Sequence, residues 1–416
     1  MTPAVNSAGS TYLPNEVLEM VFMNLVGDPT MDWHSWFRWK DIKRFVNNVR
    51  GAQPADFLLV CRQWTRVILH TRRLWTTVLV DTWTIREQGP KVVRAKIKAH
   101  LQRSGNEPLN IIYAAIHDPS LPPLEREPFG PGQPIVQVLQ GLTAAGKYPI
   151  DALLSVVAGQ GGQEMKRWKS CILARSWQLG WDEYEWMSDF LTYPTPLLES
   201  LCIWNFMSGR RPIFLDTPVL KRLVSTGYYY QIGTSVPPPC TESADISDGR
   251  LDGNSFGFGR LALELLHQIS ETRFLNIVVE GAPSSLLADE EPVRFPNLVE
   301  LRLEGDIGIV LIQKLKAPHL NSLTLHFGSR AGHKELLDDL AHADLPELSR
   351  LDLDLTNIHN PHWTLGEVGP SVIGMLSTKK ETLRMLIGTA DLEEVVTGCR
   401  KSLPSFLPRL VFSLRV

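Results

Sequence analysis

Few residues of this chain have the types and spacing that catalysis or metal binding needs. Gly159-Gln160-Gly161-Gly162 shares its glycines with phosphate-binding loops but lacks their Lys-Ser/Thr pair, so a turn is the preferred interpretation. His359 and His362 flank an Asn-Pro pair without Cys or carboxylate ligands in register, so they predict no zinc site. Cys61 lies in an apolar run and is expected to be a buried packing residue rather than a nucleophile. The sequence therefore predicts a binding protein without catalytic residues, metal or cofactor, rather than an enzyme.

Composition favours a folded protein that works inside the cell. The 416 residues are 44% apolar and 21% charged, near the globular average, and the length fits two or three domains or one elongated array. The longest apolar runs, such as the one around Ile309–Ile312, are far too short to cross a membrane. The first residues lack the features of a secretory signal, and five scattered cysteines suggest no disulfide framework. We expect a soluble protein of the cytoplasm, the nucleus or both, with no membrane partner.

The net charge of −3 conceals a basic segment near the N-terminus. Residues 33–103 contain 15 Lys and Arg against four Asp and Glu, whereas the residues before and after them are net acidic. Such a segment can attract an acidic protein, nucleic acid or an anionic membrane surface, although solvated surface charge is the common alternative.

Two apolar runs in the first 75 residues have helical spacing. Pro14 suits a first helical turn, and apolar residues then recur every three or four positions from Val17 to Leu25, before Gly27. The run from Phe57 to Ile68 repeats this spacing. Together the two runs predict a small helical bundle.

These two runs also carry a specific resemblance. LPNEVLEMVFMNLV at 13–26, followed by LLVCRQWTRVILHTRRLW at 58–75, is similar to an F-box, with its L-P-x-E helix, its V-C-R-x-W signature and its closing L-W. The resemblance implies a three-helix module that binds the Skp linker of cullin–RING ubiquitin ligases and carries a substrate-recruiting domain behind it. Residues 27–56 interrupt the module, as in the interrupted F-box-like proteins of mushroom-forming fungi. An F-box-like domain is therefore expected at 13–80, with this insertion.

The resemblance implies roles for residues of both runs. Those expected to face the linker are Leu13, Pro14, Val17, Leu18, Val21 and Leu58. Those expected to form the module's core are Phe22, Leu25, Val60, Cys61, Trp64, Leu74 and Trp75. A module this short leaves part of its apolar surface unburied, which favours a partner. Linkers of this family are acidic, so the basic residues 33–103 would favour association with one.

The insertion has two interpretations. Trp33, Trp36, Phe37 and Trp39 alternate with basic residues, which would suit stacking and phosphate contacts on single-stranded nucleic acid. The preferred alternative is an amphipathic helix that covers the flank of the module, because no other nucleic-acid signature supports the first interpretation.

A second pattern, apolar-x-x-apolar-x-apolar, recurs through the rest of the chain. The clearest copies begin at Trp168, Leu198, Phe274, Leu298, Leu320 and Leu348, and weaker ones begin at Leu220, Leu383 and Leu407. Several follow an X-Pro pair, at 195–196, 217–218, 295–296, 317–318 and 345–346. Steps of 22 to 35 residues with one short strand each resemble degenerate leucine-rich repeats that lack the family's Asn after the strand.

The segments between these copies favour helices. Helical spacing appears at Ile309–Lys316, His333–Ala343, Pro370–Lys380 and Asp391–Lys401. Strands that alternate with helices predict parallel strands with helices on the outer face. The expected fold class is therefore α+β to α/β, with a helical F-box-like module followed by an irregular leucine-rich-repeat solenoid.

Domain boundaries follow from these patterns and from composition. We expect a flexible start at 1–12, a connecting helical and strand region at 81–164 with a proline-rich segment at 118–134, and the repeat array at 165–416. Residues 231–259 are polar and rich in Gly, Ser and Pro, so they are expected to form a mobile loop.

Alternation along the strands predicts which residues face a client. Leu301 and Leu303 should point inward, so their neighbours should point to the concave face on which repeat solenoids bind partners. The residues assigned to client binding are Glu300, Arg302, Glu304, Thr324, His326, Arg350, Asp352 and Asp354. Their excess of acids favours a client with a basic patch, with ordinary solvated surface as the alternative.

The sequence leaves three functions open. The first is a substrate-recruiting adaptor of an SCF-type ubiquitin ligase, which binds the Skp linker, and through it a cullin, by the F-box and a protein client by the repeats. The second is an F-box-like repeat scaffold for protein–protein interaction outside any ligase. Nucleic-acid binding through the insertion is the third and least favoured.

Overall fold

The computed structural model describes residues 13–26, 39–115, 149–175, 193–204, 216–226, 240–247, 269–278, 292–305, 307–326, 333–354, 365–379, 381–388 and 411–414, with residues 266 and 397. The chain divides into two compact units, unit 1 (Met1–Cys171) and unit 2 (Ile172–Val416), and the division falls within strand β3 (Trp168–Arg175). The fold is α/β with a mostly parallel sheet: β1 pairs with β2 in parallel, and the pairings from β4 to β14 and of β8 with β10 are parallel as well.

Unit 1 begins with helices whose apolar residues are spaced for burial on one face. The elements are α1 (Asn15–Val26), α2 (Trp39–Gly51), the short 3-10 helix η1 (Pro54–Phe57), α3 (Arg62–His70) and the 3-10 helix η2 (Arg72–Trp75). Leu18 and Phe22 of α1 are buried four residues apart, and α2 buries Ile42, Val46 and Val49 with the same periodicity. The insertion therefore contributes a helix with a buried face.

Aromatic and aliphatic side chains of α1, α3 and η2 form the core of this module. The buried cluster consists of Leu18, Phe22, Val67, Ile68, Leu74 and Trp75. The edge of the Trp64 ring meets the Phe22 ring with centroids 4.9 Å apart. Trp75 donates its indole N–H to the Ile68 carbonyl over 2.8 Å, so its one polar atom is satisfied within the core.

A parallel strand pair follows this module. β1 (Thr77–Asp81) pairs with β2 (Leu109–Ala115) across a connection made of α4 (Thr82–Gln88) and α5 (Pro90–Ser104). Asp81 caps α4 by accepting the Thr84 N–H over 2.9 Å, and Arg50 of α2 donates to the same carboxylate over 2.7 Å. This one buried carboxylate therefore connects the insertion helix to β1 and α4.

Helix α5 packs against Trp75 through two different side chains. Arg103 places its guanidinium 4.3 Å from the centre of the Trp75 ring, and the His100 ring approaches Trp75 edge-on at 5.0 Å. Burial lowers the pKa of His100 to about 4, and the positive charges of Arg103 and Lys96 act in the same direction. His100 is therefore a neutral core residue near pH 7.

The last part of unit 1 joins α5 to β3 through a glycine-rich turn. α7 (Pro149–Ala158) packs on α5 and β1 and is followed by η3 (Gln160–Gly162) and η4 (Met165–Arg167). Gly159 has φ 75°, and a Cβ there would lie 2.8 Å from the Glu164 side chain. The turn therefore explains why residue 159 is a glycine, as the sequence predicted.

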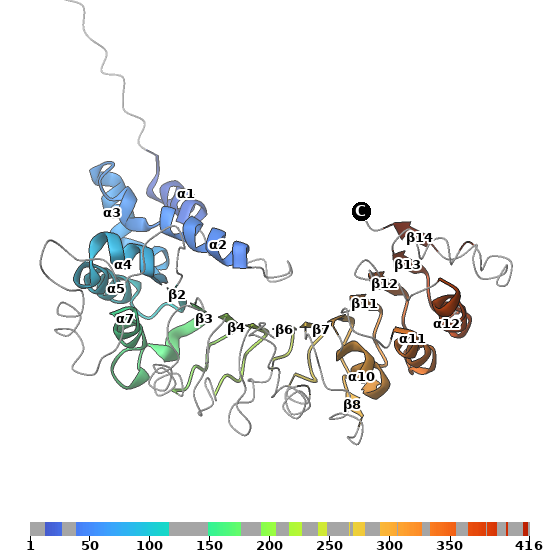
Figure 1. Ribbon diagram of the computed structural model, residues 1–416. Coiled ribbons are helices and arrows are strands. Elements are labelled where there is room, and N and C mark those ends of the chain that lie inside the picture. Colours follow the sequence, from blue (N-terminus) through green and yellow to red (C-terminus); the bar gives the residue numbers. More distant parts are fainter. Residues whose placement is uncertain are drawn as a thin grey trace, which may run out of the picture. The chain divides into compact units, whose positions relative to one another are not determined.

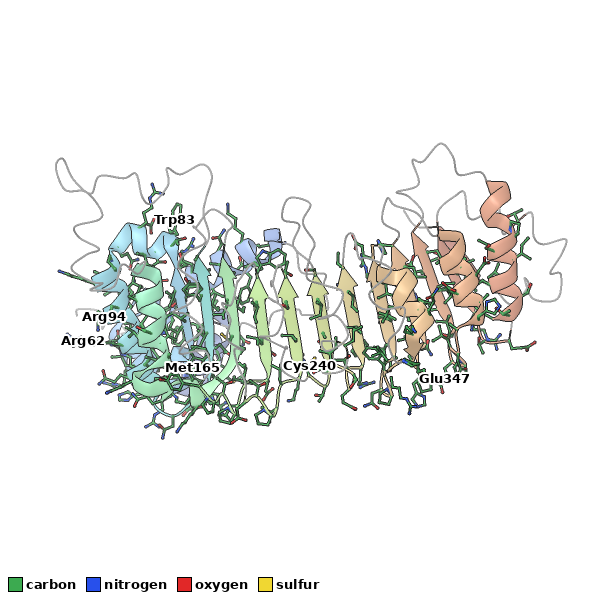
Figure 2. All side chains as sticks on the ribbon, turned by 60° about the horizontal axis from the view of Figure 1, so that its bottom comes forward. Arg62, Trp83, Arg94, Met165, Cys240 and Glu347 are labelled. Carbon is green, nitrogen blue, oxygen red and sulfur yellow. The ribbon has the colours of Figure 1, made fainter. Side chains whose placement is uncertain are left out.

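Unit 2 is a series of parallel strands that are neighbours in chain order (Figures 1 and 2). The strands are β4 (Ser200–Trp204), β5 (Arg222–Thr226), β6 (Ser243–Ser247), β7 (Phe274–Val278), β9 (Glu300–Glu304), β11 (Ser322–His326), β12 (Arg350–Asp354), β13 (Met385–Gly388) and β14 (Val411–Leu414). A small separate sheet pairs β8 (Val293–Arg294) with β10 (Leu315–Lys316). The strands expected from the apolar pattern between 198 and 353 are confirmed, and the weaker copy that begins at Leu383 overlaps β13.

Three helices cover one side of the later strands. α10 (Ile307–Lys314), α11 (His333–His342) and α12 (Leu365–Thr378) lie side by side in Figure 1 and contact one another in that order. Alternate strand residues, such as Leu301, Leu303 and Leu323, are fully buried. The register aligns these leucines across β9, β11 and β12, so they form a continuous core.

The X-Pro pairs in the sequence form one recurring turn before the strands. In the first, the Leu198 N–H donates to the Thr195 carbonyl over 3.0 Å, with Pro196 at the second position of the turn. Equivalent hydrogen bonds run to the carbonyl three residues earlier from the N–H groups of Leu220, Leu298, Leu320 and Leu348. The X-Pro pair and the turn that it forms therefore fix the direction in which the chain enters the strands.

One predicted loop contains a strand. Residues 231–259 were expected to be a mobile loop, but β6 pairs with both β5 and β7. Ala244 and Ile246 are buried, while Ser243, Asp245 and Ser247 alternate with them. With only Ala244 and Ile246 as apolar residues, the sequence pattern was too weak to predict this strand. Backbone hydrogen bonds to β5 and β7 hold it in place.

Some predicted helices have different bounds. The helix expected from Phe57 begins only at Arg62, because a 3-10 turn and a bend precede it, and Pro370 lies inside α12 rather than in its first turn. The helix expected at Ile309–Lys316 is α10, whose last expected residues belong to β10. Four expectations lie mainly outside the described residues: Trp33–Phe37, the segment 118–134, the histidines at 359 and 362, and the helix at 391–401.

The leucine core of unit 2 predicts a large effect of one truncation. Leu323→Ala should lower the free energy of unfolding by about 2–5 kcal/mol, because it leaves a cavity at a fully buried site. The matched control is Ser322→Ala on the opposite face of the same strand, with an expected change within about 0.5 kcal/mol. Urea unfolding followed by circular dichroism measures both, and equal losses would contradict the assigned core face.

The buried His100 predicts a pH dependence. The folded-state pKa of about 4 lies below the ordinary value of 6.5, so the unfolded chain binds more protons between these values. Stability from this group is complete above pH 6.5 and is lost as the pH falls towards 4, by about 1–3 kcal/mol. Urea unfolding at pH 7 and 4.5 should show a larger acid loss for wild type than for His100→Gln. The same loss in both proteins would overturn the assignment.

Candidate docking surface and polar strand face

Helix α1 has an exposed apolar face in addition to its buried one. The docking face consists of the exposed apolar side chains of α1 and of Leu13, two residues before its start. Its members are Leu13, Val17, Met20, Val21 and Leu25, and they are 38% to 66% exposed. Isolated exposed apolar residues are ordinary, but four along one helix, with Leu13 before it, form an unburied stripe. This arrangement can bind another apolar surface.

The docking face adjoins the start of α3. Gln63 donates its side-chain N–H to the Leu13 carbonyl over 2.7 Å and to Asn15 over 3.1 Å. Leu59 and Val60, immediately before α3, are 94% and 56% exposed. Of the fourteen large apolar side chains that are exposed among the described residues, eight lie between Leu13 and Leu69.

The structure separates the residues that the F-box resemblance assigned to the linker. Those at the surface are Leu13, Pro14, Val17 and Val21. Leu18 is only 2% exposed and belongs to the core, so its assignment to the partner surface was wrong. Leu58 is partly buried and packs against the same core. Met20 and Leu59 were missed, although Met20 lies on the same helical stripe as Val17.

The expected core residues divide in the same way. Phe22, Leu74 and Trp75 are buried, and Trp64 packs against them. The expected burial of three others was wrong, because the structure exposes Leu25, Val60 and Cys61. Leu25 lies in the last turn of α1, on the exposed side of the helix, although the next residue, Val26, packs against the cluster, and Val60 and Cys61 precede the first turn of α3. Sequence spacing alone did not show where the helix starts.

A charged cavity lies beside the docking face. It has a volume of about 400 Å³ and is lined by Glu16 and Glu19 of α1, by Arg66 at α3, and by Arg72 and Arg73 of η2 with neighbouring residues. Carboxylates and guanidinium groups are mixed along its wall, so its charges largely compensate one another. Such a wall suits exchange of ion pairs with a partner's side chains. Among the described residues, no cluster of His, Cys, Asp and Glu is arranged to hold a metal ion.

Unit 2 presents a row of polar side chains at equivalent strand positions. The positions that alternate with the buried residues of β6 to β12, called the polar strand face, place Asp245, Asn276, Arg302, Thr324 and Asp352 in register on five adjacent strands. Asn276 donates to Asp245 over 2.9 Å, and Arg302 lies 3.5 Å from the carboxylate of Glu304. The row can offer hydrogen bonds and both signs of charge to an extended segment.

Burial changes the acidity of one member of this row. Desolvation raises the pKa of the Asp245 carboxyl to about 6, while the hydrogen bond from Asn276 and the charge of Arg302 oppose the increase. Sequence reasoning missed Asp245 because it assigned this segment to a loop. The alternation of Ala244 and Ile246 was the only signal for it.

The client residues predicted from the sequence share the polar strand face. Glu300 and Arg350 are exposed, and Arg302, Glu304, Thr324 and His326 are partly buried. Asp352 is only 9% exposed, so little of its carboxylate is accessible to a client. The side chain of Asp354 lies outside the described residues.

Comparisons with known proteins give no family for this chain. No protein-family model matches it, and a search of curated protein sequences finds no significant relative. The structure adds that none of the helices it describes combines the length and apolar character of a membrane span. Function is therefore inferred from the two surfaces.

The raised pKa of Asp245 predicts an effect of Asp245→Asn. Between pH 3.8 and 6 the folded state binds more protons than the unfolded state, so wild-type stability falls as the pH rises through this range. The Asn variant keeps an oxygen acceptor for Asn276 and carries no charge. It should exceed wild type by about 1–3 kcal/mol at pH 7.5 and by less at pH 4 in urea unfolding.

The exposed Asp216 provides the control for this comparison. Asp216→Asn should change stability little at either pH. A stability difference between Asp245→Asn and wild type that is equal at pH 4 and pH 7.5 would contradict the burial of this carboxyl.

Proposed function

We propose that this protein is a substrate-recruiting adaptor of an SCF-type, cullin–RING ubiquitin ligase. In this proposal an F-box-like module in unit 1 binds the Skp linker, and through it a cullin, by means of the docking face. Unit 2 is an irregular leucine-rich-repeat solenoid that binds a protein client on its polar strand face. The protein acts in the cytoplasm, the nucleus or both.

The observation that carries the proposal is the docking face itself. The exposed apolar residues gather on α1 and before α3, within the two segments that resemble an F-box. A small helical module that leaves four apolar side chains of one helix and Leu13 before it exposed gains stability by burying them against a partner. The resemblance supplies the identity of that partner.

The polar strand face supports the second half of the proposal. Parallel strands in chain order with helices on one side match the arrangement expected of leucine-rich repeats. The polar strand face carries polar groups in register. Among the predicted client residues described there, the acids are Glu300, Glu304 and Asp352, and the bases are Arg302 and Arg350. This balance favours a client segment with basic residues.

The contribution of such an adaptor is positional. Binding the linker and the client on one chain raises the effective concentration of the client near the ubiquitin carrier. This role requires no catalytic residue, metal or cofactor from the chain itself.

One observation favours the scaffold outside a ligase as a second candidate. The insertion adds α2 to the three-helix module, and its buried Ile42, Val46 and Val49 make it part of the fold. A scaffold of this kind would use the docking face for a different partner. Binding to the Skp linker separates the two candidates.

The decisive experiment measures binding of the full chain to a recombinant Skp linker. Leu13→Ala/Val17→Ala/Val21→Ala should weaken binding at least about tenfold, because it removes exposed apolar contacts without touching the core. The matched control is Leu197→Ala/Val219→Ala, two exposed apolar residues of unit 2, for which affinity should stay unchanged. Absence of wild-type binding in isothermal calorimetry would reject the adaptor function and leave the scaffold.

A further inference from the structure

Helix α5 has a cationic exposed face that the docking face does not explain. The helix contains five Lys and Arg and no Asp or Glu over Pro90–Ser104. Val93, Ile97, His100 and Ser104 form its buried face. On the opposite face Lys91, Arg94 and Lys98 are exposed along about 10 Å of helix. These three residues are called the cationic face.

The charges of the cationic face are not neutralised within the described part of the chain. Three other cations of unit 1 have carboxylate partners there, because Arg50 pairs with Asp81, Arg73 with Glu107 and Arg167 with Glu164. No described residue forms an ion pair with Lys91, Arg94 or Lys98. Three like charges along two helical turns repel one another, so an external anion would stabilise this surface.

The cationic face belongs to the same compact unit as the docking face. α5 packs on η2, and η2 in turn contacts both α1 and α3. Helix α3 likewise contains no acidic residue and exposes Arg62 and Arg66. In the view of Figure 2, Arg62 and Arg94 lie at the same side of unit 1. Exposed cations of α3 and α5 therefore belong to the same unit as the docking face.

We propose that the cationic face binds an acidic segment of the same partner protein that occupies the docking face, and that it accelerates their association. The inference rests on the proposed function and names a second contact for it. Charges near an apolar contact raise the rate of encounter more than the lifetime of the complex. An acidic protein fits better than nucleic acid, because no aromatic side chain stands on the exposed face of α5 to stack with bases.

Association kinetics test the proposal. Lys91→Gln/Arg94→Gln/Lys98→Gln in the full chain should lower the association rate with the Skp linker about three- to tenfold at 50 mM NaCl. The difference should fall below about twofold at 500 mM NaCl, where the Debye length is only about 4 Å. The dissociation rate should not change. The matched control is Arg294→Gln/Lys316→Gln/Arg384→Gln, which removes the same charge from exposed positions of unit 2 and should leave the association rate within about 1.5-fold.

The outcomes separate this inference from the proposed function. Wild-type binding with equal association rates for both triple variants would overturn the inference and retain the adaptor. If the linker does not bind at all, the adaptor is rejected and a 20-residue poly-glutamate peptide becomes the probe. Salt-dependent peptide binding that the α5 variant loses would then support the acidic partner. Retention of oligothymidine without retention of the peptide would overturn it in favour of nucleic acid.

Discussion

In unit 2, the backbone carbonyl that precedes each of the seven strands β4, β5, β6, β7, β9, β11 and β12 accepts hydrogen bonds from two consecutive N–H groups at the start of the next strand in the sheet. The Glu199 carbonyl accepts from Lys221 and Arg222 over 2.9 and 3.1 Å. The same pair of hydrogen bonds recurs at the carbonyls of Lys221, Glu242, Arg273, Val299, Asn321 and Ser349. Each of these carbonyls belongs to the residue before a strand. The hydrogen bonds therefore align the first residue of one strand with the first residue of the next. Strand starts are separated by as few as 21 and as many as 35 residues, and the register survives this variation.

This constraint separates the core of unit 2 from its polar strand face. Because the register is fixed by the backbone, Leu301 and Leu303 of β9 meet Leu323 and Leu325 of β11, and the residues that alternate with them meet polar residues. The polar positions can then vary in charge without disturbing the core. Asp245 shows the cost of this arrangement, since its partial burial disfavours the ionised carboxylate and raises its pKa.

Unit 1 uses one helix for two purposes. Leu18 and Phe22 of α1 pack on Trp64 and Trp75, while Val17 and Val21 on the adjoining arc remain exposed. Because the buried side chains fix the orientation of α1, the exposed ones form a stripe of defined shape. In the proposed function, the positive charge of α5 would attract an acidic partner over a longer range than the apolar contacts of α1. The two helices would then set the association rate and the lifetime of the complex separately.

Much of this architecture could be read from the sequence. The spacing of Leu18 and Phe22 determined α1, and the alternating leucines determined β9, β11 and β12, because helix and strand periodicity are local properties of the chain. The X-Pro pairs likewise determined the turns before the strands. Only the tertiary structure decided that Leu18 is buried while Leu25 and Cys61 are exposed, and that Ser243–Ser247 is a strand. Burial depends on which neighbour covers a side chain, and β6 exists because β5 and β7 satisfy its backbone, so neither follows from local pattern.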